Sequence, residues 1–480
     1  MSNSSSNRST TPGLTILVRA ALFAMALLIA LVALDRPRRA ILVTTNSVSH
    51  TLCSEVFLAN RDPAQIYAEV LRPEVGMGLL DWALRYTVDG ERREVRATVA
   101  HYFSSRAVYR ERLGCLIAHG SQPADDSVPS EKDDVLRSSV ALLPEIAGRE
   151  VVEPTDTRLR AAIDRAFAEP DRPPYRWTKA VVVVHDGRVV GERYAPGYQT
   201  DTPFYGHSMT KSVINALVGI LVRQGSLSVS ESGVVPAWRG SSDQRRQITI
   251  DQLLRMASGL PSDEYAPGWD PATRMWFLER DMAAFAEDGQ LDAPPGTRWN
   301  YSNRGYMVLS RLIRDAVGGH AADVVRFAHR DLFDLLGMRN ATWEFDGTGT
   351  PVGTSQLFAS ARDWARFGML YLLDGVVGDR RILPEGWVTY SKSQTLEAGY
   401  GAGFWLNTVT TPMSRGGYWG MPGAPPDAFF ARGYLGQFVV VVPSKRLVVV
   451  RLGVSHSHDG GIESVGRLVG DVGAVLRSEQ

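Results

Sequence analysis

Cysteine and lysine are both scarce in this chain of 480 residues, which has only two cysteines and five lysines beside 47 arginines. A disulfide-rich scaffold is excluded, because such scaffolds carry many cysteines in a short chain. Basic and acidic residues balance at 52 each, so the formal net charge is zero. This balance gives no sign of a polyanion-binding surface, and we expect no nucleic acid partner. The apolar content of 44% is that of an ordinary globular protein.

The beginning of the chain differs in composition from the rest. Residues 1–13 are polar and rich in serine, threonine and asparagine, and we expect a disordered cytoplasmic tail there. Residues 14–34 are apolar apart from Thr15 and Arg19. A helix of this length spans about 31 Å, close to the thickness of a hydrocarbon core. We therefore expect a transmembrane anchor, with a cleaved signal peptide as the alternative because the uninterrupted apolar part, 20–34, is short.

The two cysteines, Cys53 and Cys115, both follow the apolar segment. An even count favours a disulfide, and such a bond persists only in an oxidising compartment. The arginines at 36, 38 and 39 point the other way, because basic residues beside a span favour the cytoplasmic side. We give the cysteine pair more weight. We expect a single-pass protein of the cytoplasmic membrane with its bulk in the periplasm or outside the cell; two free buried cysteines are the alternative.

Beyond the anchor the chain divides into two parts. Residues 35–150 form an N-terminal extracytoplasmic segment, which contains a stretch rich in serine, proline and aspartate. Residues 151–480 have strand patterns near both ends and helical patterns between them. This arrangement predicts an α+β domain in which an antiparallel sheet is flanked by helices and joined to a mainly helical subdomain. The expected strands are 181–184, 189–193, 438–442 and 447–452.

A Ser-x-x-Lys motif occurs once in the chain, at Ser208 and Lys211. Apolar residues follow it at helical spacing, so the two residues lie one turn apart on one helical face. A lysine whose pKa is lowered by burial can take the proton of a serine hydroxyl and make the oxygen a nucleophile. The alternative is a helix-capping serine with an exposed lysine one turn later.

Two further motifs carry groups suited to the same chemistry. Tyr301 and Asn303 follow a Pro-Pro-Gly loop, where the phenol can relay protons and the amide can hold both a substrate carbonyl and the lysine. Tyr434 and Gly436 precede an apolar strand, and a glycine at a strand entrance lets a ligand approach the backbone. The N–H of Gln437, together with that of Ser208, is suited to an oxyanion hole. Taken singly, these motifs also fit a packed turn and a glycine bulge.

Signals for other chemistry are weaker. The second glycine of a Gly-x-Ser-x-Gly elbow is missing after Ser208, which argues against an α/β-hydrolase. No glycine-rich phosphate loop of the Walker type is present. His456 and His458 are two residues apart in an expected strand-end loop, a spacing more typical of solvated surface than of a metal site. We expect neither a metal nor a cofactor.

In these three ordered motifs the chain resembles the serine β-lactamase and penicillin-binding-protein superfamily. It is most similar to the class C β-lactamase-like branch that includes esterases and 6-aminohexanoate-dimer hydrolases. The resemblance covers residues 155–478. It implies that Ser208 is the acylated nucleophile, that Lys211 and Tyr301 share general acid/base work, and that no metal is needed. Asn303 is then the residue that orients the substrate.

The third motif departs from the pattern of the family. Tyr434-Leu435-Gly436 stands where the resemblance implies Lys-Thr-Gly or His-x-Gly. In β-lactam recognition those positions donate hydrogen bonds to the carboxylate of the drug, whereas a phenol donates at most one and leucine none. We therefore expect poor β-lactam turnover and a small-molecule ester, amide or peptide as substrate. The alternative function is a penicillin-binding-type sensor, or a protein that binds D-Ala peptides, with slow or no turnover.

Overall fold

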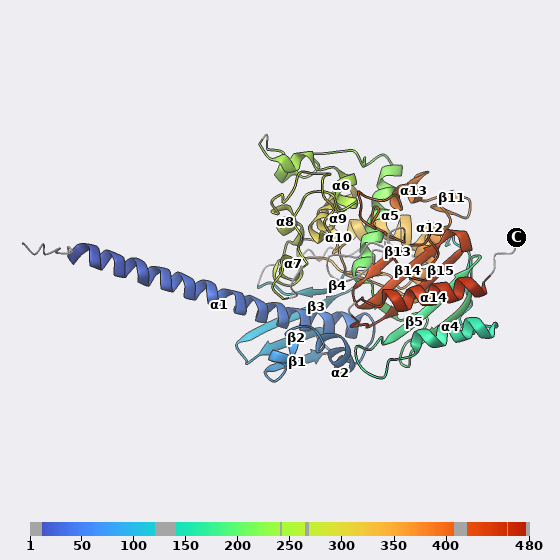
Figure 1. Ribbon diagram of the computed structural model, residues 1–480, viewed down its shortest axis with the longest axis horizontal. Coiled ribbons are helices and arrows are strands. Elements are labelled where there is room, and N and C mark those ends of the chain that lie inside the picture. Colours follow the sequence, from blue (N-terminus) through green and yellow to red (C-terminus); the bar gives the residue numbers. More distant parts are fainter. Residues whose placement is uncertain are drawn as a thin grey trace, which may run out of the picture.

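The computed structural model describes residues 12–120, 141–240, 242–264, 268–407, 420–457 and 459–476; in the first helix it describes side chains only from Arg36 onward, apart from Leu17. Its centre is a six-stranded antiparallel sheet of strand order β12-β13-β14-β15-β5-β6 (Figure 1). The strands are β5 (Thr178–His185), β6 (Arg188–Tyr194), β12 (Trp405–Leu406), β13 (Phe429–Gly433), β14 (Gln437–Val442) and β15 (Leu447–Gly453). Strands from both ends of the chain thus pair in one sheet, and the α+β prediction is confirmed.

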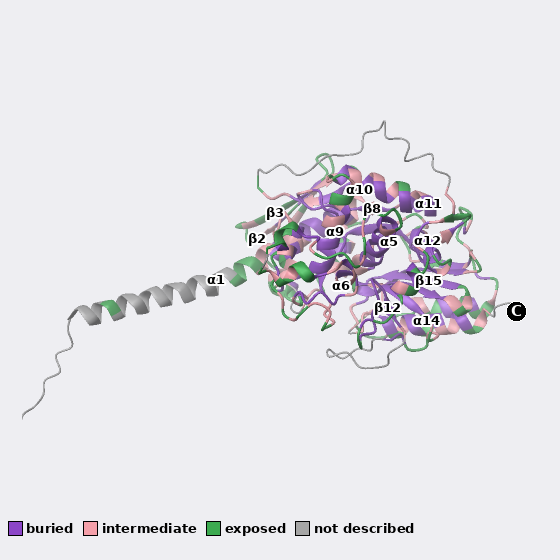
Figure 2. Ribbon diagram, turned by 90° about the horizontal axis from the view of Figure 1, so that it is seen from above, coloured by how far each residue is buried: buried purple, intermediate pink, exposed green. Residues whose placement is uncertain are grey.

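Helices cover both faces of this sheet. α4 (Thr157–Phe167) and α14 (Ile462–Val475) pack together on one face, and α12 (Ala361–Leu372) packs on the other (Figures 1 and 2). Close packing of α12 requires a glycine, because a Cβ at Gly368 would lie 2.6 Å from a methyl carbon of Val448. The near-continuous apolar sequences of β14 and β15 follow from this coverage, since strands buried on both faces do not alternate with polar residues.

The remaining helices form a second layer beside the sheet edge that carries β13. α5 (Thr210–Arg223) is buried from Thr210 to Leu221, so it is the central helix rather than a surface helix (Figure 2). An all-round apolar sequence is what a fully buried helix requires. α9 (Asn303–Val317) packs against α5, and α6 (Ile250–Leu254), α8 (Met282–Glu287) and α10 (Ala321–Ala328) pack around α9. α7 (Pro271–Leu278) packs on α8. The predicted helical subdomain therefore lies beside the sheet, with α5 at their junction.

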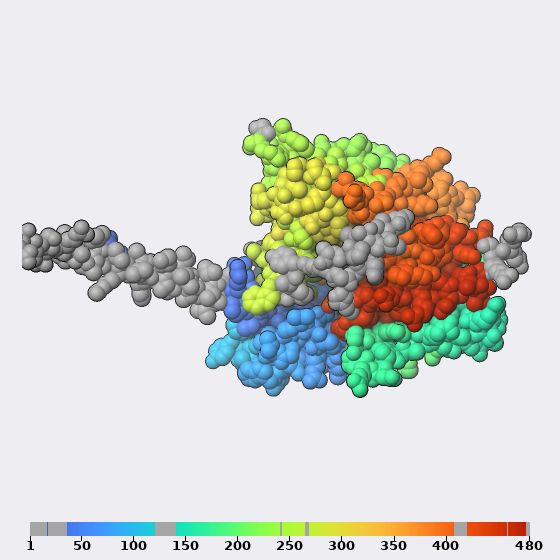
Figure 3. Space-filling model, in the orientation of Figure 1, coloured from blue at the N-terminus to red at the C-terminus, as the bar shows by residue number. Residues whose placement is uncertain are grey.

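The segment before the main domain (the body, residues 151–480) has its own small sheet. α1 (Pro12–Phe57) packs with its C-terminal part against an antiparallel meander of order β1-β2-β3-β4. The strands are β1 (Leu84–Asp89), β2 (Glu94–Val99), β3 (Phe103–Arg110) and β4 (Gly114–Ile117). Cys53 of α1 and Cys115 of β4 form a disulfide, which confirms the predicted pairing. The space-filling view shows this blue N-terminal segment lying against the red C-terminal strands (Figure 3).

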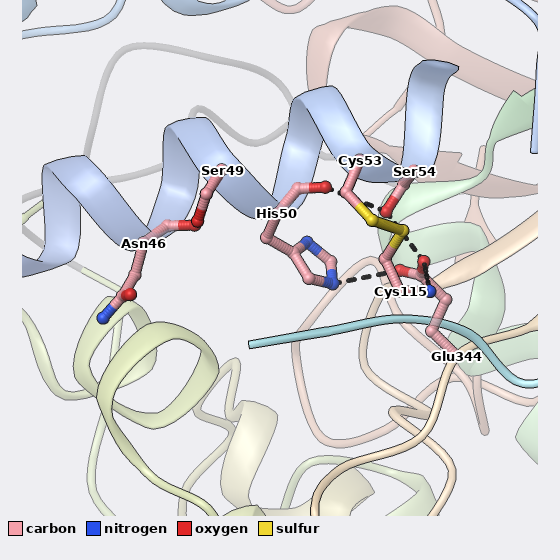
Figure 4. Close-up of a disulfide and its surroundings, with 7 residues drawn as sticks. All are labelled: Asn46, Ser49, His50, Cys53, Ser54, Cys115 and Glu344. Atoms are coloured by element: carbon pink, nitrogen blue, oxygen red, sulfur yellow. Dashed lines mark hydrogen bonds and ion pairs between the residues drawn. A yellow bond between two sulfur atoms is a disulfide. The ribbon is translucent and has the colours of Figure 1, made fainter. Parts of the chain in front are cut away.

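A buried polar group joins the N-terminal segment to the body next to the disulfide. The Glu344 carboxylate accepts hydrogen bonds from Ser54 Oγ at 2.7 Å and from the Cys115 N–H at 2.8 Å, and His50 Nε2 lies 3.3 Å away (Figure 4). Glu344 is fully buried. Buried carboxylates need such partners because an unpaired one is costly to desolvate. The segment is thus fixed to the body by specific contacts.

The anchor prediction concerns residues that the structure mostly leaves undescribed. Within the part of the chain whose side chains are described, no helix is both long enough and apolar enough to cross a membrane. Residues 14–34 lie outside that part, apart from Leu17.

Candidate active site

Ser208 lies at the junction between a short strand and the central helix. β7 (Pro203–Tyr205) leads into a 3₁₀ turn, η3 (His207–Met209), and α5 follows directly. Thr210 fixes this turn, because its hydroxyl is 2.8 Å from both the His207 carbonyl and the Ser355 carbonyl. The Ser208 side chain is therefore presented from a turn whose backbone is held on both sides.

Lys211 approaches Ser208 as the spacing predicts. Its Nζ donates to Ser208 Oγ at 3.0 Å and to the Thr354 carbonyl at 2.8 Å. The side chain is 1% exposed, and burial lowers the pKa of Lys211 to about 8, although the carboxylates of Glu264 and Asp263 oppose this shift. Desolvation disfavours the ammonium form, which leaves a substantial fraction of neutral amine near pH 8. The lysine has the position and the pKa of a base for the serine.

Tyr301 lies beside the same serine. The Ser208 side chain is among the groups that act on the pKa of its hydroxyl, and Lys211 Nζ lies 4.9 Å from the centre of its ring. Burial raises the pKa of Tyr301 far above its ordinary value, so the phenol stays protonated. The ring stacks on Trp405 with centroids 5.8 Å apart and meets Tyr400 edge-on at 6.4 Å. The aromatic packing fixes the direction in which the hydroxyl points.

Asn303 has a different set of partners from the one predicted. Its Nδ2 donates to Asp263 Oδ1 at 3.1 Å and to Glu264 Oε1 at 2.8 Å, and neither hydrogen bond of Lys211 described above involves it. Its Oδ1 is buried and, among the described residues, lacks a hydrogen-bond partner. The amide therefore orients two carboxylates beside Lys211 and Tyr301. Neither Asp263 nor Glu264 was predicted from the sequence as part of the site. The one sign of them there is that two acidic residues stand side by side shortly after Ser258-Gly259-Leu260.

The third motif is only partly where we expected it. The strand beside the serine turn is β13, and a Cβ at its last residue, Gly433, would lie 2.4 Å from the Gly206 carbonyl oxygen. The next residue, Tyr434, meets the ring of His207 edge-on at 5.7 Å. Tyr434 is thus the member of the motif that lies next to the serine turn.

Gly436 and Gln437 make contacts with β15, and their role in substrate binding and the oxyanion hole stays a prediction. Gly436 has φ +84° and accepts a hydrogen bond from the Arg451 guanidinium at 2.7 Å, so it is required for the approach of Arg451. Gln437 begins β14, one strand further from the serine, and its buried side chain donates to the Gly453 carbonyl at 2.6 Å. Of these three residues, Tyr434 is the one with a ring contact to the serine turn.

An unexpected residue completes this side of the site. The Tyr434 hydroxyl donates to both carboxylate oxygens of Glu74, at 2.9 and 3.0 Å, across 360 residues of sequence. Glu74 belongs to the N-terminal segment, so that segment reaches the surroundings of Ser208. Burial raises the pKa of Glu74, while the Tyr434 hydrogen bond and His456 oppose this shift.

Sheet, helical layer and serine turn together define the β-lactamase-like class of α+β folds. The chain belongs to the Beta-lactamase family, whose model matches residues 176–458, and it is a hydrolase of the β-lactamase fold. The 6-aminohexanoate-dimer hydrolase of Paenarthrobacter ureafaciens is 25% identical over 298 residues, which cover 57% of this chain and 72% of that protein.

Solved structures agree on the fold. A family VIII carboxylesterase superposes with a TM-score of 0.52 at 15% identity, covering 68% of this chain and 98% of the esterase. A penicillin-binding protein homologue from Caulobacter crescentus superposes with a TM-score of 0.51 at 17% identity, covering 69% and all of the respective chains.

Proposed function

We propose that this protein is a serine hydrolase that cleaves ester or amide bonds through an acyl-enzyme on Ser208. The observation that carries the proposal is the buried amine of Lys211, 3.0 Å from Ser208 Oγ, with a pKa lowered to about 8. If Lys211 served only in packing or in an ion pair, its amine would not need to donate a hydrogen bond to Ser208.

The proposed reaction uses the three side chains in turn. Neutral Lys211 takes the proton of Ser208, whose oxygen attacks the carbonyl carbon of the substrate. Protonated Tyr301 delivers a proton to the leaving alcohol or amine. Water then attacks the acyl-enzyme with the same groups acting in reverse. The oxyanion donors we propose are the N–H groups of Ser208 and Tyr434, in place of Gln437.

The substrate class rests on the relatives and on the third motif. The names of the relatives denote an amide hydrolase and a carboxylesterase, which support a small-molecule amide, ester or peptide substrate here. This mechanism uses no cofactor. Asn303 is proposed as a positioning residue for the acids beside Lys211.

Poor turnover of β-lactams stays a prediction. Tyr434 already donates its one hydroxyl hydrogen to Glu74, so it has none left for the carboxylate of a drug. The kcat/KM for hydrolysis of a chromogenic cephalosporin should lie at least about 10³-fold below the lower end of the ~10⁴–10⁸ M⁻¹s⁻¹ range of ordinary enzymes. Steady-state kinetics at a value within that range would contradict the prediction.

Replacement of the nucleophile tests the function itself. Full-length wild type should be labelled by an alkyl fluorophosphonate on Ser208, and the Ser208→Ala variant should show none of this labelling, because no other serine of the sequence stands in a Ser-x-x-Lys motif. Intact-protein mass and peptide mapping measure the adduct. Ser228→Ala, on an exposed loop, is the matched control and should label like wild type. Equal labelling of wild type and Ser208→Ala would disprove the assignment.

The placement of the protein is part of the proposal. We propose that residues 14–34 anchor it in the cytoplasmic membrane, with the hydrolase domain, 151–480, in the periplasm or outside the cell. The disulfide Cys53–Cys115 supports an oxidising compartment. The segment 35–150 is then an extracytoplasmic part that also borders the catalytic site.

A further inference from the structure

The N-terminal segment places a carboxylate beside the catalytic site through a well-supported turn. Glu74 lies between η1 (Tyr67–Leu71) and α3 (Met77–Leu80). Its N–H donates to the Leu71 carbonyl and its carbonyl accepts from the Met77 N–H, both at 3.1 Å. Leu71 and Met77 are buried in the core of the segment. The backbone position of Glu74 is therefore set by packing on both sides.

This turn is also docked on the catalytic body. Glu69, on the preceding helix, pairs with Lys179 of β5 at 2.7 Å, and its carbonyl oxygen lies 2.8 Å from His456 Nε2. The Tyr434 hydroxyl then holds the Glu74 carboxylate itself. A side chain fixed at its backbone, at its neighbouring helix and at its carboxylate is suited to recognising a ligand.

The electrostatic surroundings of this carboxylate are those of a cation-binding subsite. The phenol of Tyr434 is neutral, and Glu264 adds a second negative charge on the same side. Of the basic groups nearby, Lys179 is paired with Glu69, and Arg432 donates to the Asp459 carbonyl at 2.8 Å. His456 acts on Glu74 electrostatically and is not hydrogen-bonded to it. A substrate group that arrives here meets a carboxylate and an aromatic ring, which together favour an ammonium group.

We propose that Glu74 is a specificity-determining residue of the Ser208 site, which favours esters or amides with an ammonium group on the leaving side and disfavours those with a carboxylate there. The inference rests on the proposed function, because it assigns a substrate class to the same nucleophile. It reverses the charge preference that the family resemblance implies for this position, where β-lactam carboxylates bind.

Three matched covalent probes test this inference on the full chain in detergent. They are O,O-diethyl phosphorothiolates whose leaving thiols carry a trimethylammonium, a tert-butyl or a carboxylate group. In each reaction Ser208 Oγ forms a bond to phosphorus, the P–S bond breaks, the serine proton passes to Lys211, and Tyr301 supplies a proton to the departing thiolate. Second-order rate constants come from intact-protein mass, so slow turnover does not affect them.

Wild type should react about tenfold faster with the cationic probe than with the neutral one, and about tenfold slower with the anionic probe, as expected for one partly solvated charge pair. Glu74→Gln keeps an acceptor for Tyr434 and removes the charge. The ratio of the cationic to the neutral rate constant and the ratio of the neutral to the anionic one should therefore both fall to about two or less. Glu74→Asp should keep much of the selectivity. Glu91→Gln, an exposed change of the same charge in the same segment, should behave like wild type.

The outcomes separate this inference from the proposed function. Unchanged ratios in Glu74→Gln would overturn the inference, and so would an equal loss in Glu91→Gln, since that would reflect net charge alone. Equal reaction of all three probes with wild type would overturn it too. Labelling that persists in Ser208→Ala, or no labelling of Ser208 by any probe, would overturn the proposed function and this inference with it.

Discussion

Replacement of Lys211 by methionine should lower kcat/KM for a reactive ester by about 10²- to 10⁴-fold, the range typical of a lost general base. Methionine fills a similar buried volume without the amine, so Ser208 keeps its position but loses its proton acceptor. The Thr354 carbonyl also loses its donor, which should cost about 1–3 kcal/mol of unfolding free energy. Steady-state kinetics beside thermal unfolding separate the two effects.

The pH profile should identify the same lysine. At pH 7 a lysine of pKa about 8 is about 10% neutral, roughly three-hundredfold more than one at its ordinary pKa. Wild-type kcat/KM should therefore rise about tenfold per pH unit below this pKa and level off above it. Three neighbouring groups do not produce this inflection. The pKa of His207 is lowered to about 3 and that of Asp263 is raised to about 6. The pKa of Tyr301 is raised far above its ordinary value, so this group does not titrate near pH 8.

The exposed lysine at 392 supplies the control. Lys392→Met removes the same charge far from the serine turn and should leave both kcat/KM and the pH profile unchanged. The assignment of Lys211 would be wrong if Lys211→Met kept the rising limb near pH 8, or if its kcat/KM stayed within a factor of three of wild type.

Local spacing was enough to predict the core of the site. Ser208 and Lys211 are one helical turn apart, so their contact follows from helix geometry. Tyr301 was found through a short motif, and its contact with Ser208 depends on how α9 packs beside α5, which the sequence does not state. Four strands of the central sheet (β5, β6, β14 and β15) were also predictable, because their apolar runs are continuous and bounded by turns.

The contacts that were not predicted have a common physical origin. The conformation of Gly436 makes room for Arg451, fifteen residues later in the chain and on the next strand. The buried acidic partners of Asn303 come from an irregular segment with no periodicity. Glu74 meets Tyr434 only after the N-terminal segment has docked. Contacts of this kind depend on tertiary packing and leave no local pattern.

The same docking connects the disulfide to Lys211. Glu344 binds Ser54 and the Cys115 N–H through its side chain. Through its backbone it pairs with Gln356 and Val352, each at 2.9 Å, and so holds the ends of the loop that contains Thr354. The Thr354 carbonyl accepts the hydrogen bond from Lys211. A change at Glu344 can therefore shift the acceptor that orients the lysine.

Glu344→Ala should consequently reduce both stability and activity. Its loss leaves Ser54 and the Cys115 N–H without their buried acceptor and His50 without its neighbouring carboxylate, so unfolding free energy measured in urea should fall by about 3–5 kcal/mol. At a temperature where the variant is folded, kcat/KM should fall by roughly tenfold or more, because small misplacements of catalytic groups are costly. Glu344→Gln retains an acceptor of the same size and should lose less of both stability and activity, whereas Glu385→Ala on the surface should change neither.

If the unfolding free energy of Glu344→Ala is within 1 kcal/mol of wild type (about the worth of one ordinary hydrogen bond), the carboxylate does not hold the N-terminal segment to the body. If it is destabilised as expected yet keeps full activity when folded, Glu344 supports the fold without positioning Thr354 for Lys211.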